Sequence, residues 1–272
     1  MSKRKRSSPS GAALLRNAIR VAQVLEAAGS AKTLRKPLQV AGYGFLVRIR
    51  RLAQAITRCG TQSAYESRVL MRCMLEIQIN YAWIRLRNSH SRALRFHHYW
   101  SIDRLRLLEK AGTIFRAADY ADRRRALIAE RRKVRHLFRF RDKNGKMQWA
   151  QSWASVSSVE ARLAEVQRKE KPAAKPDPFM YGMYISFSSA THGSPNSLVE
   201  VLEVAGSRLV PKSQPEMKPK AHYIGAFILL AWAIEAFAKD SRLRRPCATD
   251  IDSVTKPLKE MLKIANKRWP AA

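Results

Sequence analysis

The sequence predicts an all-α protein, a single multi-helix bundle arranged around one central apolar helix at about 63–87. Three observations support this prediction. Apolar residues recur at helical spacing over long segments, these segments are rich in helix-forming Ala, Leu, Arg and Glu, and Gly and Pro gather between them. Hydrophobic residues make up 46% of the chain, which is enough for a substantial core. We therefore expect one helical domain at 11–272, after a basic disordered tail at 1–10.

The same periodicity places the helices in order along the chain. Gly29 and Gly60 end the first two helices, and Asp142-Lys-Asn-Gly145 is a turn signal after the fifth. The spacing from Ser157 to Glu160 is that of a capping box, which starts a short helix. The expected helices span 11–28, 38–58, 63–87, 89–112, 116–139, about 157–168, 179–192, 222–239 and 250–267, with a short one at 197–204 as an option. Surface loops are predicted at 169–178 and 206–220, and one minor β-hairpin near 206–212.

The segment 223–237 is apolar and close to the shortest length that spans a membrane. Glu235 lies within it, and a charged group is costly in lipid. We expect a buried core helix here and no membrane partner. A membrane helix is the alternative.

Positive charge is the most prominent property of the composition. The chain has 52 Lys and Arg against 21 Asp and Glu, a formal net charge of +31. Such a chain attracts polyanions. Nucleic acid is the partner that we expect first, and an anionic membrane surface is the second candidate. The alternative is a basic surface without a ligand. Predicted phosphate contacts on the basic helix at 116–139 are Arg124, Arg131, Arg132, Arg135 and His136.

Cysteine usage bounds the compartment and the chemistry. Cys59, Cys73 and Cys247 are odd in number and far apart, with no CxxC motif or Cys/His cluster. This pattern indicates a reducing compartment without structural disulfides. We expect a cytoplasmic protein with neither a metal nor another cofactor. The basic N-terminal residues have no apolar segment directly after them, so they do not form a secretory signal.

Two polar stripes cross apolar helices and form the candidate site. On the helix at 63–87, polar residues recur every four positions and share one face. Buried charges there must be paired, because an isolated buried ion is strongly destabilising. This stripe consists of Arg68, Arg72, Glu76 and Asn80.

The second stripe lies on the helix at 179–192 and consists of Tyr184, Ser188 and His192. His192 titrates near neutral pH and suits acid–base work. We expect the stripes to face each other, with Arg72 paired to Glu76 and with Ser188 and His192 completing the network. The candidate catalytic residues are therefore His192, Ser188, Arg72 and Glu76, supported by Arg68, Asn80 and Tyr184. The alternative is a buried network that fixes helix register and does no chemistry.

Three segments resemble a known family. Arg72-Cys-Met-Leu-Glu76-Ile-Gln-Ile-Asn80 resembles the Arg-x3-Glu-x3-Asn helix of an uncharacterised bacterial family, domain of unknown function 5677. Trp153-Ala-Ser-Val-Ser-Ser is similar to its Trp-anchored helix start, and Tyr181 to Ser194 is similar to its Tyr…Ser-x3-His signature. The resemblance covers roughly residues 40–240. It implies one helical domain with no settled activity.

The Ser-x3-His end also resembles the broad HEPN class of helical proteins, many of which are metal-independent ribonucleases in toxin–antitoxin or phage-defence settings. In that class an Arg-x4-6-His motif holds phosphate and moves protons on the RNA 2′-hydroxyl. With four to six residues between the two, the Arg would stand where this chain has Phe187, Ser186 and Ile185, so it is missing before His192. Arg131 and His136 match the spacing elsewhere.

The resemblance therefore implies a HEPN-like protein that engages nucleic acid and is a candidate RNase effector. RNA is favoured over DNA as its partner. The alternative is a non-catalytic helical interaction module. A homo-oligomer is left open.

Overall fold

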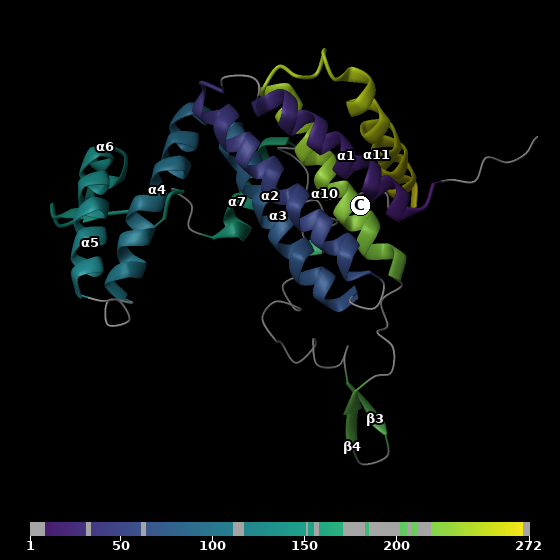
Figure 1. Ribbon diagram of the computed structural model, residues 1–272, viewed down its shortest axis with the longest axis horizontal. Helices are drawn as coiled ribbons and strands as arrows, with labels where there is room; N and C mark the ends of the chain where they lie inside the picture. Colours follow the sequence, from purple (N-terminus) through teal and green to yellow (C-terminus); the bar gives the residue numbers. More distant parts are fainter. Residues whose placement is uncertain are drawn as a thin grey trace, which may run out of the picture.

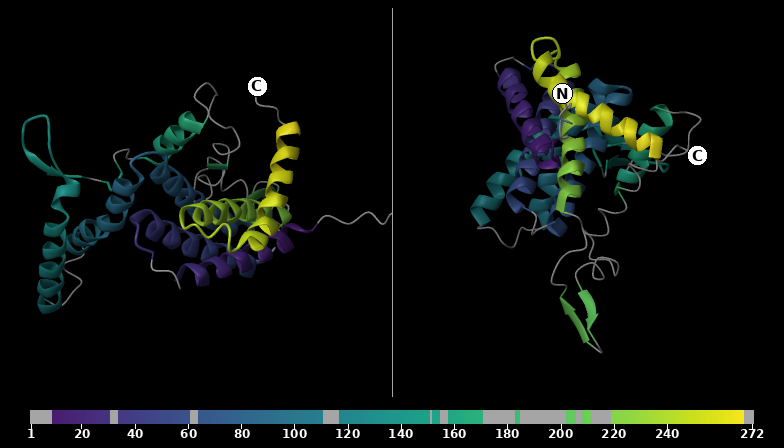
Figure 2. Two further views of the ribbon diagram at one scale, coloured as in Figure 1. Left: turned by 90° about the horizontal axis from the view of Figure 1, so that it is seen from above. Right: turned by 90° about the vertical axis from the view of Figure 1, so that its right-hand side faces the viewer.

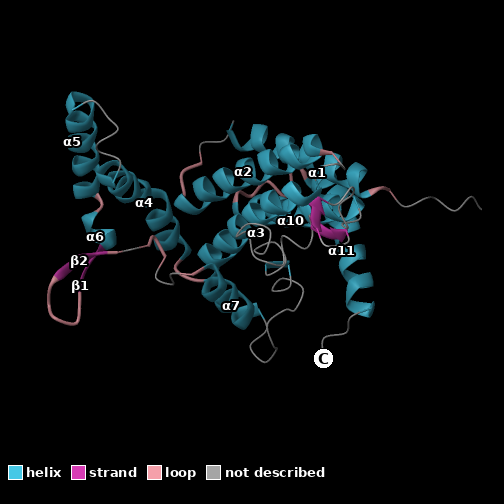
Figure 3. Cartoon of the chain, turned by 90° about the horizontal axis from the view of Figure 1, so that it is seen from below, coloured by secondary structure: helices cyan, strands magenta, loops and turns pink. Residues whose placement is uncertain are grey.

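Four long helices pack together and form the main core of the molecule (Figure 1). They are α1 (Gly11–Ser30), α2 (Pro37–Cys59), α3 (Ala64–Leu86) and α10 (Pro219–Asp240). α11 (Ala248–Arg268) packs on α1 and α10, and α7 (Val159–Glu170) packs on α3 (Figure 3). The predicted all-α fold is confirmed. This computed structural model describes residues 9–30, 34–60, 64–110, 117–150, 152–154, 158–170, 183–184, 202–205, 208–211 and 219–268.

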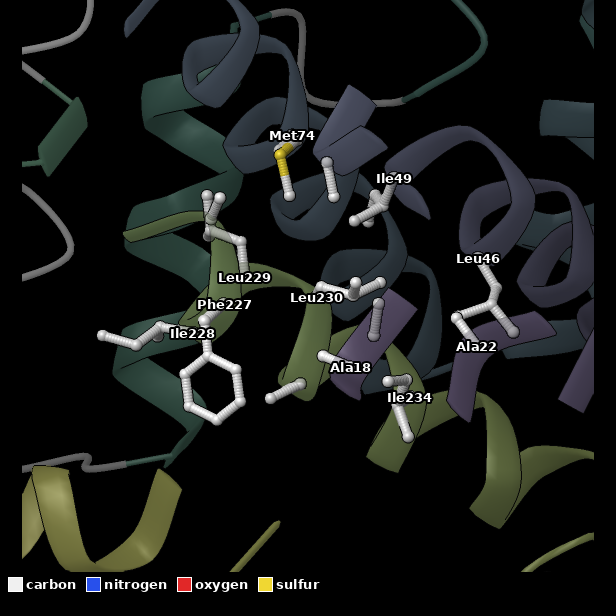
Figure 4. Packing of buried hydrophobic residues seen from close by; sticks show 14 of the residues in the cluster. Ala18, Ala22, Leu46, Ile49, Met74, Phe227, Ile228, Leu229, Leu230 and Ile234 are labelled. Atoms are coloured by element: carbon white, nitrogen blue, oxygen red, sulfur yellow. The ribbon is translucent and has the colours of Figure 1, made fainter. Parts of the chain in front are cut away.

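Two helices share the centre of the bundle. α3, the predicted central helix, packs against α2, α4, α7 and α10, while α10 packs against α1, α2, α3 and α11. Figure 4 shows Leu230 and Ile234 of α10 among Ala18 of α1, Ile49 of α2 and Met74 of α3. α10 can lie so deep because it carries no charged side chain from His222 until Glu235, which forms an ion pair with Arg244. The apolar side chains shown in Figure 4 all belong to one continuous core of buried residues, which α1, α2, α3 and α10 share with α11.

The expected core helix at 222–239 corresponds to α10. Among the described residues, Ala221–Asp240 is the single stretch with the length and apolar character of a membrane span. In the most apolar stretch of this helix, 67% is buried inside the protein. Burial against three other long helices accounts for its composition.

An arm extends from the bundle (Figure 2). It consists of α4 (Ser89–Lys110), α5 (Ala117–Lys133), α6 (Arg135–Phe138), β1 (Arg139–Arg141) and β2 (Met147–Trp149). The two strands pair antiparallel, and the arm has its own small core of Ile102, Val134, Phe138 and Ala150. The base of α4 packs on α2 and α3, so this helix joins the arm to the bundle.

The prediction of one helix over 116–139 is wrong at its end. The helix stops at Lys133, Val134 leaves helical geometry with φ −102° and ψ 9°, and Arg139 already lies in β1. Val134 and Phe138, on either side of the short segment Arg135–Leu137, both pack with Ile102 in the small core of the arm. The turn predicted after it is present, because Asp142 accepts hydrogen bonds from the backbone amides of residues 144 and 146, each at 2.9 Å.

A second hairpin confirms the strand pair expected near 206–212, slightly earlier in the chain. β3 (Leu202–Ala205) pairs antiparallel with β4 (Arg208–Pro211). The optional helix at 197–204 is therefore wrong over 202–204, and 197–201 lie outside the described residues. Of the predicted loops, 171–178 and 212–218 also lie outside them, while α7 runs to Glu170 and α10 begins at Pro219. Of the predicted tail, only residues 9 and 10 are described.

A close approach between α2 and α3 depends on a glycine. The Tyr81 hydroxyl donates a hydrogen bond to Asp240 at 2.7 Å, and Arg85 pairs with the same carboxylate at 2.8 Å. Burial, followed by the charge of Asp240, raises the pKa of Tyr81, so the phenol stays protonated. A Cβ at Gly42 would lie 2.4 Å from the Tyr81 hydroxyl oxygen, which is too close for any side chain.

We therefore expect Gly42→Ala to lower the free energy of unfolding by about 1–3 kcal/mol, because the helices must move apart. Gly44→Ala is the matched control. A Cβ at Gly44 meets nothing within 4 Å, and alanine favours helix over glycine by roughly 0.5–1 kcal/mol. Urea denaturation of both variants measures the difference. Equal stabilities would contradict the packing described for Tyr81.

His222 makes stability depend on pH. It is fully buried, and neither ring nitrogen has a hydrogen-bond partner among the described residues. Burial lowers its pKa from the ordinary 6.5, because the charged ring would lose its hydration. Below about pH 6.5 the unfolded chain therefore binds a proton that the folded protein does not, and stability falls as pH falls.

We expect His222→Leu to reduce this loss, since leucine fills the site without titrating. Melting temperatures of both proteins at about pH 7.5 and pH 5.5 measure it. Identical losses in the two proteins would show that His222 does not contribute.

Candidate functional site

Arg72 is the centre of the candidate site. Its side chain projects from α3 and the residue is only 4% exposed. Its Nε and Nη2 atoms both lie 2.8 Å from Glu76 Oε1, so the predicted ion pair is present. Its Nη1 donates to the backbone oxygen of Tyr184 at 3.1 Å, and the guanidinium lies 3.5 Å from the centroid of the Tyr184 ring. Arg72 thus joins the first polar stripe to the second.

Tyr184 extends the network to α7. Its hydroxyl donates a hydrogen bond to the carboxylate of Glu160. This bond is the main reason that the pKa of Glu160 lies below its usual value. Burial, and then the bond to Glu160, raises the pKa of Tyr184. The tyrosine therefore remains a hydrogen-bond donor at neutral pH.

Arg162 brings a second buried cation to the same place. It lies on α7, is 6% exposed, and lies 5.5 Å from the centroid of the Trp153 ring. Burial lowers its pKa, and the nearby carboxylates of Glu76 and Glu160 act in the opposite direction. Two arginines and two carboxylates thus share one region, which offsets the cost of removing each charge from water.

Sequence reasoning identified only part of this network. The i, i+4 spacing found Arg72 and Glu76, but it gave no signal for Arg162. Glu160 was expected only as part of a capping box beginning at Ser157, a residue outside the described part of the chain. The structure shows Ser158 Oγ accepting from the Ala161 amide at 3.0 Å, while Glu160 binds Tyr184.

The remaining predicted members have different places. Ser188 and His192 lie outside the described residues. Arg68 is half-buried on α3, and Asn80 has a buried Oδ1 without a hydrogen-bond partner. No group of three or more His, Cys, Asp or Glu that would hold a metal occurs in the described part of the chain.

A pocket of about 670 Å³ adjoins the network. It lies between α2, α3 and the base of α4, and Glu76 and Asn80 belong to its wall. Glu76 is therefore shared: one of its oxygens binds Arg72, while its side chain is 39% exposed. The other lining residues are Val40, Ala41, Tyr43, Gly44, Phe45, Arg48, Cys73, Ile77, Phe96 and His97.

The predicted phosphate contacts all lie on the arm. Arg124, Arg132, Arg135 and His136 are exposed. Arg131 differs from them, because it is half-buried and lies 3.9 Å from the centroid of the Trp149 ring. It holds the hairpin β1–β2 against α5.

The chain matches a known family. A family described as being of unknown function, DUF5677, matches residues 39–207. The matched segment contains the Arg72 network and the arm. No curated protein matches the chain. No solved structure matches it either.

The network predicts a strong effect on stability. Arg72→Met leaves the partner carboxylate and the Tyr184 carbonyl without their donor, so we expect a loss of about 3–5 kcal/mol in unfolding free energy. Arg51→Met removes the same charge from an exposed position on α2 and should change stability by no more than about 0.5 kcal/mol. Urea denaturation compares the two. A small loss for Arg72→Met would show that its contacts are not stabilising.

Proposed function

Because this chain belongs to DUF5677, a family of unknown function, we propose its role from its own residues: it is a helical protein that engages nucleic acid, RNA before DNA, through the arm. The observation that carries the proposal is the combination of cations and exposed apolar side chains on β1–β2. Phe140 on β1 is 50% exposed between Arg139 and Arg141, and Met147, which pairs with Arg141 across the hairpin, is 42% exposed. Basic grooves with aromatic side chains bind single strands, because the cations contact phosphates and the rings stack on bases.

The helices of the arm extend this surface. Arg123, Arg124, Arg125, Arg132 and Lys133 are exposed on α5. Local ion pairs neutralise some of the charge, for example Lys133 with Glu130 at 2.6 Å. Trp100 on α4 is 43% exposed, and Arg104 lies 5.4 Å from its ring centroid. The arm thus offers several stacking and phosphate-binding groups together.

The finer form of the proposal is a HEPN-like, metal-independent ribonuclease of the cytoplasm, acting in phage defence or a toxin–antitoxin pair. His192 would move the proton, with Ser188 beside it, and Glu76 would take part from the pocket wall. Arg72 would act as a positioning residue, because a side chain so deeply buried cannot reach phosphate. Arg131 and His136 on the arm are the second candidate pair.

A non-catalytic interaction module is the second candidate function. The observation that favours it is that groups of the protein itself bind Arg72, among them Glu76, the Tyr184 carbonyl and the Tyr184 ring. Such a network specifies helix register without chemistry. Under this proposal, the arm still binds nucleic acid, but no RNA is cut.

Fluorescence anisotropy with a labelled single-stranded RNA tests the arm. We expect the double variant Arg139→Gln/Arg141→Gln to weaken binding by about tenfold or more at low salt and to flatten the salt dependence. Phe140→Ala should weaken binding at all salt concentrations by about 1–3 kcal/mol, the usual value of one stacked base. Arg16→Gln/Arg51→Gln, which removes two exposed charges from the bundle, is the matched control. Equal losses in both double variants, or binding independent of salt, would refute the role of the arm.

The same RNA tests the enzymatic part. Wild-type protein should cut it without added metal, and His192→Ala or His136→Ala should abolish cutting while leaving binding intact. Absence of cleavage and of toxicity on expression would eliminate the ribonuclease and leave the interaction module.

A further inference from the structure

The pocket between α2, α3 and α4 has the features of a small-molecule site. Its volume of about 670 Å³ falls within the range of roughly 300–1,000 Å³ that ligand sites occupy. Its walls combine aromatic rings with a few polar groups, which is the usual composition of such sites. It lies where the arm leaves the bundle, since Phe96 and His97 belong to α4. Figure 3 shows α4 between the bundle and α5.

The walls favour a flat ligand. Tyr43, Phe45 and Phe96 line the pocket, and the rings of Phe45 and Phe96 are 4.7 Å apart between centroids. Gly44 presents bare backbone, because a Cβ placed there would meet nothing within 4 Å. A planar ring can therefore lie against α2 at Gly44 with aromatic side chains beside it.

Two hydrogen-bond acceptors stand one helical turn apart on α3. Both bonds from Arg72 end on Oε1 of Glu76, so Oε2 takes no part in them. Asn80 also lines the pocket, and its Oδ1 is buried without a hydrogen-bond partner among the described residues. Rotation about the last, soft torsion of the asparagine exchanges its oxygen with its amide nitrogen, so the side chain can present an acceptor to a ligand N–H in the pocket.

The facing helix supplies donors. Arg48 on α2 lines the same pocket and is exposed at its rim. The ligand edge near α3 must therefore carry neighbouring N–H groups, and the edge near Arg48 must carry acceptors. Guanine has this arrangement, with N1–H and the exocyclic amine on one edge and with O6 and N7, which arginine binds in a bidentate manner, on another. Adenine presents a ring acceptor beside its amine, which would face the carboxylate unfavourably.

We propose that this pocket binds a guanine-type heterocycle, either as a free nucleoside or as an unstacked base of single-stranded RNA. The base stacks among Tyr43, Phe96 and the bare backbone of Gly44. Glu76 and Asn80 accept its N–H groups, and Arg48 donates to its O6 and N7. The proposal stands apart from the charge of the arm, because guanosine carries no phosphate.

Isothermal titration calorimetry of the full chain with guanosine and adenosine tests the proposal. Guanosine should bind roughly tenfold or more tightly than adenosine, since each well-made bidentate pair discriminates by about that factor. Gly44→Leu should abolish binding by filling the pocket, and because its Cβ meets no neighbour, the melting temperature should not fall. Glu76→Gln and Arg48→Met should each weaken binding by about tenfold. Arg51→Met, an equal change outside the pocket, should have no effect.

Two further binding measurements identify the source of the base. A six-nucleotide uridine RNA with one guanosine is compared with its all-uridine equivalent. Guanosine binding that Gly44→Leu removes supports a free nucleoside. Affinity gained only from the guanosine within the RNA, and lost in Gly44→Leu, supports a base in a strand.

Equal affinity for guanosine and adenosine, or binding that Gly44→Leu leaves unchanged, overturns the proposal. The absence of guanosine-dependent binding in both the nucleoside and the RNA measurements also overturns it. The variant Arg139→Gln/Arg141→Gln separates the two proposals, because it should lose RNA binding while keeping guanosine binding.

Discussion

Mutual repulsion among 52 basic side chains, with a net charge of +31, is the constraint that the rest of the structure must satisfy. The protein does so by turning several arginines inward. Arg72 lies on the Tyr184 ring and Arg92 on the Trp83 ring, each at 3.5 Å, and each also pairs with a carboxylate. Arg95 donates hydrogen bonds to the backbone carbonyls of Leu137 and Trp153. It thereby connects α4 to α6 in the arm and to the residues before α7. Buried guanidinium groups thus act as connections between helices as well as charges.

This use of arginine divides the molecule into two electrostatic regions. In the bundle, many cations are matched by acids or carbonyls, as with Arg50 and Glu26 at 2.5 Å. On the arm, exposed cations lie beside exposed apolar groups such as Phe140, and the small core of the arm buries few side chains. The arm therefore presents exposed cations together with exposed apolar side chains, and the pocket lies at the base of this arm.

The candidate site shows where local pattern suffices and where it does not. Arg72 and Glu76 are neighbours on any helix, so their pairing follows from the i, i+4 spacing and the apolar surroundings. Tyr184 was expected as a member of the second stripe, but its contact with Arg72 is visible only in the tertiary structure. Glu160 and Arg162 had no such signal, because their partners are distant in sequence and meet them only when α7 packs on α3. The buried Oδ1 of Asn80 likewise becomes visible only once neighbouring helices enclose it.

The sequence by itself determined the helices of the bundle, since their apolar periodicity and their Gly and Pro boundaries are local properties. It also favoured a core helix for α10, and the packing of this helix against α1, α2, α3 and α11 is a property of the tertiary structure. Tertiary structure decided the break at Val134, after which the chain enters the hairpin β1–β2 and Phe138 lies in the small core of the arm. It also decided the close contact of Gly42 with Tyr81 and the pocket beside Gly44. Such features depend on the distance between helices, which no single segment encodes.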